Sequence, residues 1–327
     1  MTTQAAGAAA TRADAGSSAP FELPTELAID TSVAKRIIVD FIRSQLRQAG
    51  FERVLVGLSG GIDSALVAYL SAEAVGPERL LTVLMPYRTS SPASREDAEE
   101  VVRRLGCASR LVDISAIVDG YFETGSPPPD PMAPATAVDA TAQGTTGTAA
   151  TAAGTSPLRR GNFMARARMA VLYDHSVTWG GLVAGTSNKT ESLIGYTTLW
   201  GDMAAAFHPI GDLYKSQVRQ MARDVGVPEE IVSKAPSADL WPGQTDETEV
   251  GLSYAEIDRI LFALVDRRRT PVEVASMGFD PDVVSRLDRM VAAAEFKRQM
   301  PPIAKLGPRT AGIDYLYPRR RPGSART

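Results

Sequence analysis

The sequence is short of the side chains that usually build redox, metal and nucleophilic centres. Its 327 residues include one cysteine, Cys107, and two histidines, His175 and His208. A single cysteine excludes an internal disulfide and a zinc site made of cysteines, and it is consistent with a reducing cytoplasm. The two histidines are isolated and have no evident partner residues. They therefore form neither a metal site nor a serine hydrolase triad. Any chemistry must therefore come from phosphate-binding, carboxylate and lysine groups.

Long apolar runs and an excess of positive charge are also missing. No run of about eighteen apolar residues occurs, so we expect no membrane span. The N-terminus has no basic stretch followed by an apolar one, which argues against a secretory signal. A formal net charge of −3 argues against nucleic-acid binding as the main task. We therefore expect a cytoplasmic protein.

Lysine is scarce and unevenly distributed. The chain has six lysines, and five of them follow residue 185. Where a chain uses arginine for its solvated positive charges, a retained lysine indicates a place that needs a compact point charge. Lys189, Lys215 and Lys297 are therefore candidates for site residues.

The most informative pattern present is a strand, a glycine loop and a helix start in immediate succession. An apolar run ends in Ser59-Gly60-Gly61, and a helix-forming segment follows at Ile62. Such a loop presents backbone N–H groups and the positive end of a helix dipole to a phosphate, with the hydroxyls of Ser59 and Ser64 as further donors. Asp63 would repel that phosphate unless a cation lay between them. The pattern predicts a pyrophosphate site with Mg²⁺.

Two common nucleotide-binding loops do not fit this segment. A Rossmann fingerprint needs G-x-G-x-x-G, and a Walker A loop needs a Gly-Lys pair, which the chain lacks. A turn that only closes a strand–helix unit remains as the structural alternative. The S-G-G-x-D-S pattern after a strand instead resembles the PP-loop of ATP pyrophosphatases. Those enzymes split ATP between the α and β phosphates to adenylate a substrate.

Hydrophobic periodicity predicts alternating strands and helices. The predicted strands cover 53–58, 80–86, 109–114 and 181–186. The predicted helices cover 29–49, 62–75, 90–105, 161–179, 210–225, 253–265 and 281–297, and Asp30 or Thr31 is expected to cap the first of them. This order predicts an α/β fold with a doubly wound, Rossmann-like parallel sheet and a helical C-terminal part. Ligands bind such sheets at the carboxyl ends of the strands.

Three segments interrupt this pattern. Residues 1–20 are rich in Ala, Thr, Gly and Ser, and we expect a disordered N-terminus. Residues 124–158 have almost no apolar bulk and are expected to be a flexible, low-complexity insertion in a single domain that spans 21–327. The polar segment 239–249 is either a mobile lid or a solvated loop.

A second polar segment follows the strand at 181–186, which places it beside the glycine loop. A helix cap at Thr186 or Ser187 accounts for part of it. Capping leaves Asn188, Lys189 and Asp202 without a purpose, so we interpret the segment as a continuation of the nucleotide site.

Taken in order, these motifs resemble the NAD synthetase family, whose members amidate deamido-NAD. The resemblance runs from about residue 25 to 320, apart from the insertion, and it implies a fold of the adenine nucleotide α-hydrolase type. It rests on the residues at 57–64, 161–166, 185–191, 201–202, 211–215, 236–239 and 296–298. The PP-loop alone is shared with GMP synthetase, asparagine synthetase and tRNA-modifying enzymes, so the combination carries the specificity.

The resemblance implies sites for ATP, deamido-NAD and Mg²⁺. The ATP-binding residues would be Gly57, Leu58, Ser59, Gly60, Gly61, Ile62, Asp63, Ser64, Thr186, Lys215 and Ser237. Asn162, Arg166 and Lys297 would bind deamido-NAD. Asp63 and Glu191 would hold Mg²⁺ by hard oxygen ligands. Lys215 and Asp202 would be catalytic, Asp202 by binding ammonium or accepting its proton.

The chain departs from some family members at the deamido-NAD site. Phe296 stands where those members carry a histidine, Leu199 replaces a lysine, and Ala206 replaces an aspartate. Ser237 replaces a threonine and keeps the hydroxyl. The family's ATP-binding residues therefore match this sequence better than its deamido-NAD-binding residues do.

The reaction that the resemblance implies needs no protein nucleophile. A carboxylate of deamido-NAD attacks the α-phosphorus of ATP, releases pyrophosphate and forms an acyl-adenylate, and ammonia then displaces AMP. Members that use glutamine carry an extra nitrilase-like domain, for which this chain has no room, so we expect direct use of ammonia. The family also implies a homodimer.

Two other functions compete with this interpretation. One is a different PP-loop amidase or a tRNA-modifying adenylating enzyme, but thiolating members usually need catalytic cysteines and tRNA binders need a basic face. The other is a regulatory nucleotide-binding protein without catalysis. Such a protein would be expected to lose Asp63, Glu191 or Lys215, and all three are present.

Overall fold

The computed structural model describes residues 23–124, 156–234 and 251–314. The predicted disordered N-terminus and most of the predicted insertion lie outside these ranges. So do Ser237 and the polar segment 239–249. The predictions for these parts of the chain therefore stay predictions.

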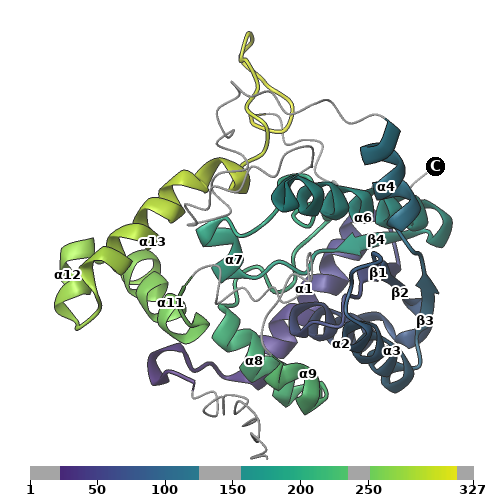
Figure 1. Ribbon diagram of the computed structural model, residues 1–327, viewed down its shortest axis with the longest axis horizontal. Coiled ribbons are helices and arrows are strands. Elements are labelled where there is room, and N and C mark those ends of the chain that lie inside the picture. The colour runs from purple at the N-terminus through teal and green to yellow at the C-terminus, as the bar shows by residue number, and fades with distance from the viewer. Residues whose placement is uncertain (1–22, 125–155, 235–250, 315–327) are drawn as a thin grey trace, which may run out of the picture.

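A four-stranded parallel sheet forms the centre of the molecule (Figure 1). Its strands are β1 (Arg53–Gly57), β2 (Leu80–Leu84), β3 (Ala108–Leu111) and β4 (Gly181–Ala184). Their order is β3-β2-β1-β4, and Val56 of β1 lies opposite Thr82 of β2 and Ala184 of β4. From β1 the chain adds β2 and then β3 on one side of β1. It later returns and adds β4 on the other side of β1. The point where a doubly wound sheet reverses in this way lies between β1 and β4, which confirms the predicted fold class.

Helices cover both faces of the sheet (Figure 1). On one face lie α1 (Thr31–Ala49), α2 (Ile62–Val75), α3 (Pro92–Leu105), α8 (Lys215–Asp224) and α9 (Glu229–Ser233), and on the other lie α4 (Ser115–Thr124) and α6 (Pro157–Trp179). Successive residues of β1 serve the two faces, because side chains alternate along a strand. Val54 and Val56 pack with α1 and α2, whereas Leu55 packs with α4 and α6.

A second, helical core lies beside the sheet. It is built from α7 (Lys189–Ile194), α11 (Tyr254–Leu261), α12 (Pro271–Ser276) and α13 (Pro281–Ala293), with the π-helical turn η3 (Phe262–Asp266) and the 3₁₀ turn η4 (Glu295–Arg298). Two further 3₁₀ turns, η1 (Thr25–Leu27) and η2 (Pro77–Arg79), precede α1 and β2. Ile257, Ile260 and Leu287 are fully buried in this core. This group confirms the predicted helical C-terminal part.

The predicted bounds of helices and strands agree best with the structure where a capping residue or a glycine marks the end of the element. The predicted helix 62–75 is α2, and the Asp30 carboxylate accepts a hydrogen bond from the Val33 N–H at the start of α1. The helix predicted from residue 210 begins only at Lys215, because residues 210–213 form a separate turn. The predicted helix 281–297 ends as α-helix at Ala293 and continues as η4.

The structure also contains α4, α7, α9 and α12, none of which periodicity predicted. Among the described helices, none has the length and apolar character needed to cross a bilayer.

Candidate active site

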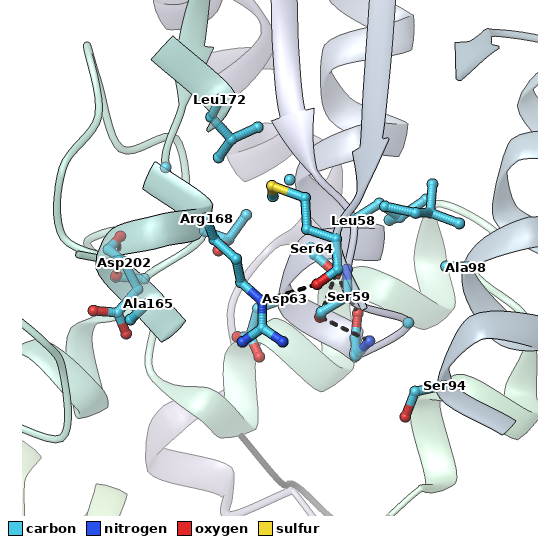
Figure 2. Close-up of a pocket in the computed structure, with 18 of the residues that line it drawn as sticks. Leu58, Ser59, Asp63, Ser64, Ser94, Ala98, Ala165, Arg168, Leu172 and Asp202 are labelled. Atoms are coloured by element: carbon cyan, nitrogen blue, oxygen red, sulfur yellow. Dashed lines mark hydrogen bonds between the residues drawn. The ribbon is translucent and has the colours of Figure 1, made fainter. Parts of the chain in front are cut away.

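A cavity of about 580 Å³ opens at the carboxyl ends of β1 and β4, where the strand order reverses (Figure 2). Its walls come from the loop 57–64, the segments 84–86 and 183–187, the helices α3, α6 and α9, and residues 196–204. Glu191 and Lys215 complete the lining. The predicted glycine loop and the predicted second polar segment therefore meet in one cavity, although they are more than a hundred residues apart in the sequence.

The glycine loop has a conformation that only glycine fits at its centre. Gly60 has a φ of +84°, and a Cβ atom built on it would lie 1.9 Å from the backbone oxygen of Ser94 on α3. The left-handed backbone disfavours any other residue, and the contact with α3 excludes a side chain. The loop is therefore pressed against the first turn of α3.

The two loop serines hold the loop itself together. Ser64 Oγ accepts a hydrogen bond from the Ser59 N–H at 3.2 Å and donates to the Gly61 carbonyl at 3.0 Å. Ser59 Oγ accepts from the Gly61 N–H and lies 3.1 Å from Ser64 Oγ (Figure 2). The sequence predicts these hydroxyls as phosphate donors, which stays a prediction, and the structure shows that they also stabilise the turn.

Helix α2 begins directly behind the loop without a side-chain cap. Gly61 is its N-cap residue, and no side chain accepts from its first N–H groups. A helix start of this kind is a ready anion-binding site, because its N–H groups and its dipole both favour negative charge. The structure thus places the predicted phosphate site at the floor of the cavity.

A lysine joins the two predicted metal ligands. Lys215 Nζ lies 2.5 Å from Asp63 Oδ2 and 3.0 Å from Glu191 Oε1, and the Lys215 side chain is 4% exposed. Two carboxylates that contact the same ammonium group can also contact the same metal ion. Among the described residues, no group of three or more His, Cys, Asp and Glu side chains could hold a metal. The pair therefore fits Mg²⁺ only if phosphate oxygens or water complete the coordination.

Asn188 connects these carboxylates to the start of α7. Its Oδ1 accepts from the Glu191 N–H at 3.0 Å, and Glu191 Oε2 accepts from the Asn188 N–H, which makes a capping box. Its Nδ2 donates to Asp63 Oδ1 at 2.8 Å. The helix cap considered from the sequence is thus real, but its residue is Asn188 and not Thr186 or Ser187. The same residue also belongs to the site.

Asp202 lies at the other end of the cavity (Figure 2). Its Oδ1 accepts from the Thr198 N–H at 2.6 Å, and the residue lines the cavity. Although the residue is exposed, desolvation by the protein packed around the carboxylate raises the pKa of Asp202 to about 6. A carboxyl group with such a pKa can gain or lose a proton near neutral pH.

The predicted deamido-NAD residues lie behind the loop 195–202 and do not line the cavity. Lys297 Nζ donates to the carbonyls of Gly195 and Thr197, and Arg166 Nε donates to the carbonyl of Leu199. Asn162 Oδ1 accepts from the hydroxyl of Thr198. The three side chains therefore support the loop that ends in Asp202.

Of the remaining predicted residues, some line the cavity and others do not. Thr186 lines the cavity beside β4. Lys189 does not, because its Nζ pairs with Asp266 at 2.8 Å and with Asp212 at 3.2 Å. His208 packs against Gly185 behind the strand end, where burial lowers the pKa of its imidazole.

Sequence reasoning missed three basic residues that line the cavity, Arg95, Arg168 and Lys234. Arg168 Nε donates to the Met85 carbonyl at 3.0 Å, and its guanidinium group points toward the glycine loop (Figure 2). Lys234 Nζ pairs with Asp97 of α3. A signal for Arg168 exists in the helical period: the cavity face of α6 is formed by residues 165, 168, 169 and 172, whereas Asn162 and Arg166 share another face.

Comparisons with known proteins match nearly the whole chain to one family. The family model for NAD synthase matches residues 34–301. The curated NH(3)-dependent NAD(+) synthetase of Trichlorobacter lovleyi is 45% identical over 295 residues, which cover 90% of this chain and 98% of the relative.

Solved structures show the same similarity. The NH3-dependent NAD synthetase from Campylobacter jejuni is 31% identical with a TM-score of 0.66, and the match covers 85% of this chain and 100% of that one. The NMN synthetase from Francisella tularensis has a TM-score of 0.69 at 26% identity, covering 85% and 99% of the two chains.

Proposed function

The chain belongs to the NAD synthase family, and we propose that the cavity between β1 and β4 is its active site. The reaction is the ATP-dependent amidation of deamido-NAD to NAD with ammonia, through an acyl-adenylate, with release of AMP and pyrophosphate. The observation that carries the assignment of the site is the meeting of the glycine loop, Asp63, Glu191 and Lys215 at one point of the cavity.

ATP binds with its phosphates at the start of α2. The N–H groups of the loop 57–64 and of the first turn of α2 face the phosphates, with Thr186 and Ser237 as further ATP contacts. Lys215 donates to the phosphate oxygens, which lie next to Asp63 and Glu191, the two carboxylates that Lys215 contacts in this structure. These donors stabilise the charge that develops on pyrophosphate as it leaves.

Mg²⁺ is the metal that fits the carboxylate pair. Asp63 and Glu191 would hold it through their carboxylate oxygen atoms. When bound, the metal neutralises the phosphate charge that Asp63 would otherwise repel. Asn188 orients both carboxylate groups, because it bonds to each of them.

Asp202 serves the second half-reaction. Ammonium is the main form of ammonia in neutral solution, and it must lose a proton before it can attack the acyl-adenylate. A carboxylate with a pKa near 6 both attracts the cation and accepts that proton. Asn162, Arg166 and Lys297 fix the loop that carries Asp202, and we place deamido-NAD along this loop.

The acceptor and the nitrogen source are tested together with purified protein. We expect NAD formation and pyrophosphate release from ATP, Mg²⁺, ammonium chloride and deamido-NAD. Each alternative acceptor, including the deamido form of NMN, is measured in parallel, because a solved neighbour is an NMN synthetase. Preference for that acceptor over deamido-NAD, or activity with glutamine but not ammonium, would contradict the proposal.

The homodimer is a further part of the proposal, and it rests on the family resemblance alone. Light scattering on the purified chain measures it directly. A monomer at the concentrations that support full activity would contradict it.

A further inference from the structure

A buried carboxylate outside the cavity binds the residues next to two site residues. Asp258 lies on α11 and is fully buried. Its Oδ1 accepts from Thr190 Oγ1 at 2.6 Å, and its Oδ2 accepts from Ser216 N at 2.7 Å and Ser216 Oγ at 2.6 Å. A buried charge is tolerated where several donors satisfy it, and Asp258 has three.

The partners of Asp258 are the sequence neighbours of Glu191 and Lys215. Thr190 precedes Glu191 in the first turn of α7, and Ser216 follows Lys215 in the first turn of α8. A further hydrogen bond joins the two helices, because the Lys215 N–H donates to Thr190 Oγ1 at 2.9 Å. Asp258 therefore binds both helix starts at the point where each presents a site residue.

These bonds close a ring that passes through the active site. From Asp258, one arm runs through Thr190 to Glu191, and the other runs through Ser216 to Lys215. The ring closes where Lys215 Nζ meets Glu191 Oε1 at 3.0 Å. Helix α11 also supports the Lys215 side chain directly, since the ring of Tyr254 lies 5.2 Å from Nζ.

We infer that Asp258 is a positioning residue that sets the distance between Glu191 and Lys215 for ATP and its metal. The inference rests on the proposed use of those two residues. Both must act on the same group of phosphate oxygens, and a displacement of about 1 Å between such groups can reduce a rate about a hundredfold. Asp258 itself does not line the cavity, so it acts only through Thr190 and Ser216.

A simple helix-capping role would need only half of this arrangement. A carboxylate that accepts from the Ser216 N–H stabilises the start of α8 through the helix dipole. The bond to Thr190 adds nothing to that cap, yet it connects the cap to α7. The Thr190 hydroxyl accepts from Lys215 N, so its single proton is directed to Asp258 Oδ1.

The proposed role of Asp258 requires both of its carboxylate oxygens to accept hydrogen bonds, and conservative substitutions can test this requirement. Asp258→Asn keeps the shape but replaces one accepting oxygen with an N–H donor, so one arm of the ring loses its bond. Thr190→Val breaks the same ring at one arm only, while Thr190→Ser preserves the hydroxyl. Ile260→Val loosens α11 in its buried core without touching the ring.

We expect Asp258→Asn and Thr190→Val each to raise the KM for Mg·ATP and lower kcat, by about tenfold to a hundredfold in kcat/KM. The KM for ammonium should stay within about twofold, because Asp202 lies at the other end of the cavity. Thr190→Ser and Ile260→Val should keep the wild-type KM for Mg·ATP. The double variant Asp258→Asn/Thr190→Val should be no worse than the poorer single variant, because both break one ring.

Thermal unfolding of every variant separates positioning from stability. A wild-type KM for Mg·ATP in folded Asp258→Asn or Thr190→Val would overturn the inference. Additive effects in the double variant would also overturn it, as would an equal rise in the KM for Mg·ATP in Ile260→Val. If Asp258→Asn fails to fold, the comparison of Thr190→Val with Thr190→Ser decides the question. Failure of the wild-type enzyme to bind Mg·ATP would instead contradict the proposed function.

Discussion

At the scale of single residues, the site depends most on Lys215. Its ammonium group neutralises two enclosed carboxylates, and after ATP binds it is proposed to face the departing pyrophosphate. We expect Lys215→Ala to lower kcat by about a hundredfold or more, the usual effect of losing one transition-state donor. Steady-state assays of NAD formation measure this.

The same substitution should change how the protein responds to magnesium. Without Lys215, Asp63 and Glu191 repel each other, so the variant should melt at a lower temperature than wild type. Magnesium then replaces the missing cation and should raise the melting temperature more in the variant than in wild type. Lys189→Ala is the matched control, because Lys189 pairs with Asp266 outside the cavity. Equal kcat values for Lys215→Ala and wild type would remove Lys215 from the mechanism.

The pKa of Asp202 predicts a pH dependence for the ammonia step. Its pKa is raised from 3.8 to about 6, so the carboxylate that accepts a proton is lost as the pH falls through 6. The ratio of wild-type to Asp202→Asn activity should therefore be constant above pH 7 and fall below pH 6. Taking the ratio removes the change in ammonia protonation, which both proteins experience alike. A flat ratio down to pH 5 would contradict the role.

Stability should respond to the same group with a defined sign. The folded protein binds the Asp202 proton more tightly than the unfolded chain, so this residue lowers stability as the pH rises from about 4 to 6. Asp202→Asn lacks this effect. Its melting temperature relative to wild type should therefore increase over that range, measured in matched buffers.

At the scale of elements, the contact between the glycine loop and α3 gives a direct test. In Gly60→Ala, a Cβ atom would meet the Ser94 backbone oxygen at 1.9 Å, so loop or helix must move. We expect loss of ATP binding together with lower stability. Gly106→Ala is the control, because Gly106 also has a positive φ but has open space around it. That change should cost only the left-handed strain, about 1 kcal/mol, and leave ATP binding intact. Calorimetric titration with Mg·ATP distinguishes the two.

Prediction from sequence worked for elements and for the loop, and it failed where contacts between distant helices decide. The succession at 53–75 is local, so β1, the loop and α2 could be predicted from residue pattern alone. The pairing of Lys189 with Asp266 and the bonds of Asp258 join residues 42 to 77 positions apart, and only the packing of α11 and η3 against α7 and α8 brings them together. The loop serines are predicted phosphate donors, and the sequence could not show that their hydroxyls also bond to each other and to the loop backbone.

At the scale of the whole molecule, α8 joins the two cores. Val218 packs in the core of the sheet, whereas Tyr214, directly before α8, packs in the helical core. Gln217 also bonds to the carbonyl of Leu27, whose side chain belongs to the helical core. We propose that the two cores form one cooperative unit.

Urea unfolding monitored by far-UV circular dichroism and by tryptophan fluorescence should then give coincident curves. Saturating Mg·ATP should move both curves together, since its proposed ligands come from both parts. Two separated transitions would contradict a single unit.

The long separation between Asp63 and Lys215 has a consequence for the protein while it is being made. The two residues are 152 positions apart, so at about 5–20 residues per second a ribosome finishes Asp63 roughly 8 to 30 s before Lys215. The edge of β1 that receives β4 also stays unpaired for most of that interval. A nascent chain consequently carries the glycine loop and Asp63 before Lys215 exists, and the arrival of β4 completes the sheet before Lys215 emerges. The proposed ATP site is therefore completed only late in synthesis, when Lys215 joins Asp63.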